Sequence, residues 1–302
     1  MNRKSTEGDL LKGAAFLVAG FMVIPLMDVG AKDLGGQGYA PVLVAWARFA
    51  VSAVVLSPVL LKQGTVRQMA GPGWKMQIVR AVMLTTATVL FFSALVTMPI
   101  ADALAVYFVY PFLITLLAPL VLSEQVGLRR FMAVLIGFSG SLLIIRPGFQ
   151  EVPVGVYYVL AAAVCFAMFN LLTRRLTGLN DPWLTVFYQS IVGAAVLTPF
   201  VFAHWQWPDT RALGLVALMV SAAVIGHWLL IKAYEQAPAS LLAPFGYFEM
   251  VSAVILGFLW FGDFPDEFTW LGIAVIVSTG IYISLRERKR KQALRAPAGP
   301  QG

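Results

Sequence analysis

Apolar residues follow one another along most of this chain in long runs, which charges, prolines and glycines interrupt at short intervals. Ten runs are present, at about residues 10–31, 41–61, 76–98, 101–122, 128–145, 154–173, 183–203, 211–233, 241–261 and 268–285. A hydrocarbon core about 30 Å thick takes about 20 helical residues to cross. The runs lack the alternation of barrel strands, and only a helix satisfies its own backbone in hydrocarbon. We therefore expect an all-α membrane protein with ten transmembrane helices.

Composition supports a membrane protein with little soluble mass. Of the 302 residues 59% are hydrophobic and 12% charged, whereas soluble domains carry about 25% charged residues. The first apolar run, from Leu10 to Gly30, exceeds the roughly 7–15 residues of a signal-peptide core, so we expect a retained helix. The single cysteine, Cys165, forms no intramolecular disulfide and is too few for a cysteine metal site. We expect no metal and no cofactor.

Lysine and arginine predict the orientation of these helices. With the amino terminus inside, 18 of them fall on the cytoplasmic side and 3 outside, and Arg48 lies within a helix. This bias follows the positive-inside rule and places both termini in the cytoplasm. It also explains the net charge of +7 without nucleic acid, because the basic residues gather at helix ends and in the tail.

The two halves of the chain repeat each other. The second helix has Pro41 and the segment 55–58, which match Pro182 and 196–199 in the seventh, 141 residues later. Further matches lie 142 or 139 residues apart: Gly13, Asp28 and Lys32 with Gly155, Asn170 and Arg174, and Pro99, Glu124 and Phe131 with Pro238, Asp263 and Trp270.

Five crossings are an odd number, so the second half enters the membrane from the opposite side. We therefore predict two inverted five-helix repeats, at 10–147 and 152–285, between a segment at 1–9 and a basic cytoplasmic tail at 286–302. Inverted repeats allow two arrangements of similar energy around a site near the bilayer midplane. That geometry is the one used for alternating access.

Short motifs add a family resemblance over about residues 10 to 287. They are Met27-Asp28-x3-Lys32, Arg48-Phe49, Ile100-Ala101-Asp102-Ala103, Tyr110-Pro111, Arg146-Pro147-Gly148, Ala237-Pro238-Ala239 and Phe261-Gly262-Asp263-x-Pro265. With ten helices in two halves, the chain resembles the drug/metabolite transporter superfamily and its ten-helix EamA-type carriers. The resemblance implies a proton- or gradient-linked carrier of riboflavin, S-adenosylmethionine or amino-acid-like metabolites, with a cavity lined by helices 1, 3, 4, 6, 8 and 9. In the ninth helix the chain departs from the family, since Glu249 stands near the centre and Pro244 comes earlier.

Aromatic and acidic residues in the fourth, eighth and ninth helices are candidates for binding a solute. Tyr107 and Tyr110 share one helix face, as do Phe245, Phe248 and Glu249 after Pro244. With Trp228 they suit a flat or apolar solute, although aromatic stripes at helical spacing also arise from packing alone. Glu249 is either a ligand for a solute or proton, or a structural group bonded to a neighbouring helix.

The remaining polar candidates are ionisable groups within helices or at their ends. His227 is either a proton relay or a neutral, hydrogen-bonded histidine. Asp28 with Lys32, and Asn170 with Arg174, lie one turn apart and are either gates or interfacial pairs. Arg48 is a candidate partner for Asp28 or Asp102.

Enzyme motifs are lacking in this sequence. No H-E-x-x-H, G-x-S-x-G or P-loop is present, and the H-x4-D spacing at 204–209 lies in a loop without a supporting domain. We expect a non-enzymatic secondary transporter of a small organic metabolite in the bacterial inner membrane, monomeric or homodimeric, in contact with lipid and coupled to protons or another ion. The alternatives are an intramembrane enzyme acting on lipid and a non-transporting scaffold.

Overall fold

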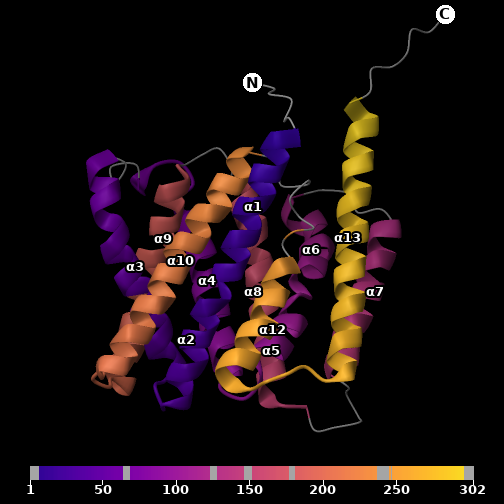
Figure 1. Cartoon of the computed structure of the whole chain (residues 1–302). Coiled ribbons are helices and arrows are strands. Elements are labelled where there is room, and N and C mark those ends of the chain that lie inside the picture. Colours follow the sequence, from indigo (N-terminus) through magenta and orange to yellow (C-terminus); the bar gives the residue numbers. More distant parts are fainter. Residues whose placement is uncertain are drawn as a thin grey trace, which may run out of the picture.

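The computed structural model describes residues 7–63, 69–122, 128–145, 152–176, 181–236, 245 and 247–295. Within this part of the chain every regular element is a helix, and the elements form an upright bundle (Figure 1). In order they are α1 (Glu7–Val23), α2 (Pro25–Gly36), α3 (Pro41–Gln63), α4 (Trp74–Leu95), α5 (Ile100–Tyr107), α6 (Tyr110–Leu122), α7 (Leu128–Ile145), α8 (Val154–Arg175), α9 (Pro182–Val201), the short 3₁₀ helix η2 (Phe202–His204), α10 (Thr210–Gln236), α12 (Phe248–Phe261) and α13 (Glu267–Arg295).

Among the described residues, six helical stretches are long and apolar enough to cross a membrane. They are Leu11–Gly36, Pro41–Lys62, Trp74–Leu95, Val154–Thr173, Trp183–His204 and Thr210–Leu230, and shorter apolar helices cover Ile100–Ile114, Phe248–Phe261 and Glu267–Thr279. Many large apolar side chains face outward, among them Leu120 at 81% exposed and Leu259 at 73%. Water would oppose such a surface, so the exterior suits a hydrocarbon solvent.

Two of the predicted helices are broken rather than continuous. The first divides at Ile24, where the chain bends and α2 restarts with Pro25, whose missing N–H suits a first helical position. The fourth divides at Phe108 and Val109 into α5 and α6. The pattern of apolar residues continues across both breaks, so it did not predict them.

The last helix is longer than its apolar run. The pattern predicts an end near residue 285, but α13 continues to Arg295 through the basic segment. Charged residues continue a helix readily in water, because helix propensity is high for Arg, Lys and Glu. The beginning of the basic tail is therefore helical.

Four helix pairs make the most extensive contacts: α4 with α8, α1 with α10, α7 with α13, and α3 with α9. Glycines permit close approach at these crossings. A Cβ on Gly272 of α13 would lie 2.6 Å from the carbonyl oxygen of Gly140 of α7, and one on Gly140 would lie 2.9 Å from that of Gly272. Packing of small residues is a main source of helix association in lipid.

Candidate functional site

Seven aromatic side chains pack together where α5 gives way to α6 and where α12 begins. We call them the aromatic cluster: Phe91, Tyr107, Phe108, Tyr110, Phe166, Phe169 and Tyr247. The Tyr107 ring centroid lies 4.8 Å from that of Phe91 and 5.3 Å from that of Phe166. The cluster joins α4, α5, α6 and α8 to the segment before α12, and its rings offer flat apolar surface with three phenolic hydroxyls.

The break between α5 and α6 places both predicted tyrosines in the cluster. The amide of Val109 donates to the carbonyl oxygen of Val106 at 3.1 Å, which is a tighter turn than α-helix. Tyr107 ends α5 and Tyr110 begins α6, and their ring centroids lie 5.5 Å apart. The structure thus brings Tyr107 and Tyr110 together, as the sequence led us to expect.

Charged groups lie beside this cluster. Asp28 of α2 is 3% exposed, and its Oδ1 has no hydrogen-bond partner among the described residues. Arg48 of α3 is 7% exposed, donates to Thr88 Oγ1 at 3.2 Å, and interacts electrostatically with Asp28 and Tyr107. A buried charge in a membrane protein is costly without partners or water. The structure therefore brings Arg48 near Asp28, the first of its two predicted partners.

Glu249 occupies the first turn of α12. It is partly buried and within electrostatic reach of Asp28 and Tyr107. The sequence led us to place it about nine residues into a helix, but α12 begins only at Phe248. The amino-terminal turn of a helix favours a negative or hydrogen-accepting group.

Other predicted site residues do not join this group. The side chains of Trp228 and Phe248 are 41% and 40% exposed, and neither ring contacts the aromatic cluster. Their positions satisfy helical spacing, but each side chain points away from the bundle. The side chains of His227 and Arg174 lie outside the described residues. Asn170 donates to the carbonyl oxygen of Phe166 at 2.7 Å within its own helix.

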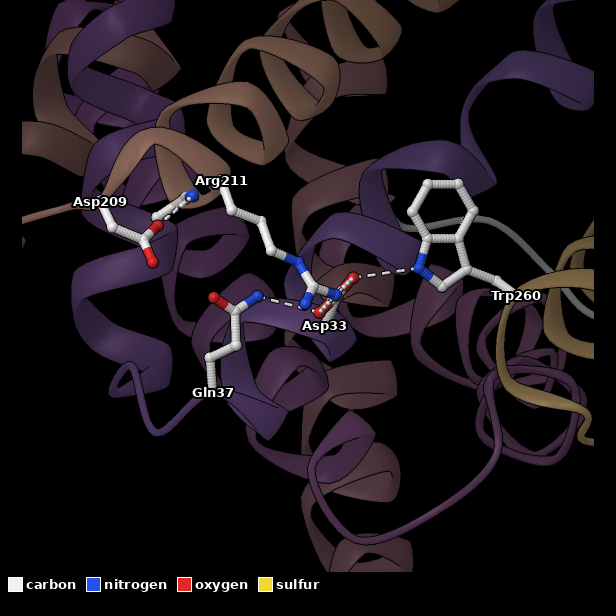
Figure 2. Close-up of polar contacts among 6 residues, drawn as sticks. Asp33, Gln37, Asp209, Arg211 and Trp260 are labelled. Carbon is white, nitrogen blue, oxygen red and sulfur yellow. Dashed lines mark hydrogen bonds and ion pairs between the residues drawn. The ribbon is translucent and has the colours of Figure 1, made fainter.

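A group of polar residues closes the end of the bundle opposite the start of α1 and the end of α13. This polar cap consists of Lys32, Asp33, Gln37, Arg211, Trp260 and Asp263 (Figure 2 shows its centre). Asp33 accepts hydrogen bonds from Arg211 at 2.9 Å, from Gln37 at 2.9 Å and from Trp260 at 3.0 Å. The polar cap therefore ties α2 to the starting turn of α10 and to α12.

Lys32 belongs to the polar cap and not to a pair with Asp28. Its Nζ lies 2.5 Å from Asp263 Oδ2, donates to the carbonyl oxygen of Met98 at 3.3 Å, and stands 4.8 Å from the Phe261 ring centroid. The predicted intrahelical pair of Asp28 and Lys32 is wrong, because the long lysine side chain extends to the end of the bundle while Asp28 stays buried. Asp102 lies in the first turn of α5.

Sequence reasoning missed Arg80. We counted it with the basic residues flanking a helix, but it is 2% exposed inside the bundle. Its Nε donates to Thr173 at 2.9 Å and its Nη2 to Gln189 at 3.1 Å, while the guanidinium lies 4.6 Å from the Phe169 ring centroid. The signal was its position six residues after Trp74, where α4 begins. A residue nearly two turns from the end of a helix lies deep enough for its side chain to be buried between neighbouring helices.

Comparison with known proteins decides the family. The model of the EamA-like transporter family matches residues 11–146 and again 153–286. The chain belongs to the EamA-like transporter family. It is thus a multi-pass membrane transporter and not an enzyme.

Relatives of this EamA-like transporter carry metabolites in both directions. An S-adenosylmethionine uptake transporter of Rickettsia prowazekii is 25% identical, and the alignment covers 92% of this chain and 94% of that protein. A riboflavin transporter of Vibrio cholerae is 27% identical over 94% and 97% of the two chains. A pseudopaline exporter of Pseudomonas aeruginosa is 28% identical over 91% and 97%.

A solved crystal structure shares the fold of this EamA-like transporter. It superposes with a TM-score of 0.65 at 20% identity, and the match covers 94% of this chain and 99% of that one. At this identity the likeness concerns the fold alone.

Proposed function

We propose that this EamA-like transporter is a secondary carrier that moves a small organic metabolite by alternating access of two inverted five-helix repeats. The metabolite is amino-acid-like, riboflavin-like or S-adenosylmethionine-like, in keeping with the relatives. Energy comes from an ion gradient or from the solute gradient itself.

The observation that carries the proposal is the symmetry of the helix contacts. If the repeats exchange, α4 corresponds to α10, and α8 corresponds to α1 with α2. The α4–α8 pair then maps onto α10–α1, while α3–α9 and α7–α13 map onto themselves. These are the four most extensive contacts in the described bundle, which is the pattern that a two-fold relation between the repeats requires.

Individual residues support the same relation. Phe108 and Tyr247 occupy equivalent positions, 139 residues apart, and their ring centroids lie 5.6 Å from each other. Equivalent residues touch only near a symmetry axis. The aromatic cluster and Glu249 therefore lie near the axis, where both repeats contribute to one site.

The helices group into two packing units that can move against each other. The first unit contains α4, α5, α6 and α8, and the second contains α1, α2, α10 and α12, since helices within each unit pack on one another. The units contact each other through α12 with α5 and through α2 with α4 and α5. We infer a state that is closed at the polar cap, and the charge count predicts that this end faces the outside of the cell.

A screen of the purified protein tests the substrate class. Thermal stability is measured with riboflavin, S-adenosylmethionine and aromatic amino acids, and solutes that stabilise the protein are followed into proteoliposomes. We expect at least one of them to raise the melting temperature and to accumulate. If none of them stabilises the protein or enters the vesicles, the proposed substrate class is wrong.

A further inference from the structure

Arg80 carries an unsatisfied donor deep in the bundle. Its Nη1 has no hydrogen-bond partner within the described part of the chain, although Nε and Nη2 are both engaged. A buried donor of a charged group that is left unpaired is costly. An anion that binds reversibly would accept a hydrogen bond from Nη1 and would not tie one helix permanently to another.

The surroundings hold the guanidinium in one orientation. Thr173 of α8 and Gln189 of α9 accept from two of its nitrogens, and Phe169 lies 4.6 Å from its carbon. Three side chains, from α8 and α9, thus fix the plane of the group. A rigid guanidinium loses little conformational entropy when a planar anion binds.

Arg80 stands at one end of the aromatic cluster. Phe169 stacks on Phe166 at 5.5 Å between centroids, and Phe166 lies 4.8 Å from Tyr110. Helix α4 ends at the polar cap, next to Met98 whose carbonyl oxygen accepts from Lys32, so Arg80 lies in the other half of the bundle. By the rise of α4 it stands about 12 Å from Thr88, where Arg48 is bound.

Gln189 links Arg80 to accessible space. The same residue lines a pocket between α3, α9 and α10, together with Arg48, Ser52 and Ser190. The polar wall of this pocket continues through the Gln189 amide to the guanidinium. An anionic group entering this pocket would meet the Gln189 amide, whose oxygen accepts from Nη2 of Arg80.

We infer that Arg80 binds a carboxylate of the transported solute while the aromatic cluster holds its flat, apolar part; this rests on the proposed carrier function. One guanidinium balances one negative charge, so a carboxylate suits it better than a doubly charged phosphate ester. The solute class is therefore an aromatic or heterocyclic compound that bears a carboxylate, and not a neutral ring system.

Matched pairs of solutes test this inference on the purified full-length protein. The probes are L-tryptophan with L-tryptophan amide, and S-adenosylmethionine with its decarboxylated form. For each we measure the concentration that gives half-maximal thermal stabilisation. Removing the carboxylate is expected to raise this concentration about tenfold or more, because one charge-assisted hydrogen bond to Arg80 is lost. Equal values for the acid and the matched compound, or no stabilisation by either acid, would overturn the inference.

Variants identify the residue responsible. Arg80→Gln should abolish the difference between acid and matched compound, Arg80→Lys should keep part of it, and Arg175→Gln, which removes an exposed arginine, should leave it unchanged. Retention of the full acid preference in Arg80→Gln contradicts the assignment. The wild-type comparison stands by itself if Arg80→Gln does not fold. Accumulation of solutes in proteoliposomes without acid preference defeats this inference only, whereas no accumulation of any probe defeats the carrier function as well.

Discussion

A disulfide across the two packing units is expected to arrest transport. A Cβ on Gly35 of α2 would lie 4.0 Å from the Cβ of Val96, just after α4, and bridged cysteines have Cβ atoms about 3.5–4.5 Å apart. The clash of such a Cβ with Val96 Cγ2, at 2.8 Å, disappears when Val96 is itself replaced by cysteine. The double variant Gly35→Cys/Val96→Cys should therefore form a bond with little strain.

The consequence for movement follows from the same geometry. A disulfide keeps the two Cα atoms within about 7 Å, so this part of the polar-cap end cannot open while the bond exists. The bond closes a loop of about 60 residues and stabilises the folded protein against unfolding by roughly 4 kcal/mol on chain-entropy grounds. The arrest of movement follows from the covalent limit alone. Transport should fall to the background of empty vesicles under oxidation and recover when the bond is reduced.

The assay is solute exchange in proteoliposomes with the natural Cys165 replaced by alanine. Each single cysteine variant serves as a control, because it carries the same side chain without the bond. Bond formation is followed by electrophoretic mobility. If the fully oxidised double variant exchanges solute at the rate of its reduced form, the two units do not part at this end and the reasoning is refuted.

Three further substitutions, and one control variant, test separate parts of the structure. Asp33→Asn should lower the unfolding free energy by about 1–2 kcal/mol, because a buried acceptor of hydrogen bonds from three residues loses its charge. Asp209→Asn is the control and should change the unfolding free energy little, since asparagine caps a helix as well as aspartate. If Asp33→Asn and Asp209→Asn have equal melting temperatures, the polar cap does not stabilise the fold. Gly272→Leu should cost about 3 kcal/mol or more by forcing α7 from α13, and an unchanged melting temperature would speak against this crossing. Glu249→Gln should reduce transport at least tenfold and flatten its pH dependence, and unchanged transport with unchanged pH dependence would remove Glu249 from the site.

The apolar pattern predicts helices well where a helix is straight. The run at 128–145 coincides with α7, and the run at 41–61 differs from α3 by two residues at its end. Apolar length is a direct physical requirement of the bilayer. It contains no information about where a helix breaks, so Ile24 and Val109 were missed although prolines stood beside both breaks.

Spacing along one helix predicts neighbours on that helix only. Tyr107 and Tyr110 were found because they belong to one local segment. The partner of Lys32 was not found, because Asp263 is 231 residues away in the chain and a lysine side chain reaches either partner. The burial of Arg80 was missed for the same reason. A charged residue near a helix end can lie at the surface or in the interior, and only the positions of the neighbouring helices decide between the two.

Exchange of solute across the membrane tests the central claim most directly. Proteoliposomes containing the purified protein are loaded with unlabelled solute from the stabilising set, and entry of the labelled solute is followed without any imposed ion gradient. A carrier that alternates between two sides should fill loaded vesicles faster than empty ones, with the label rising above its external concentration and then falling. Equal entry into loaded and empty vesicles, for every solute that stabilises the protein, would contradict the account.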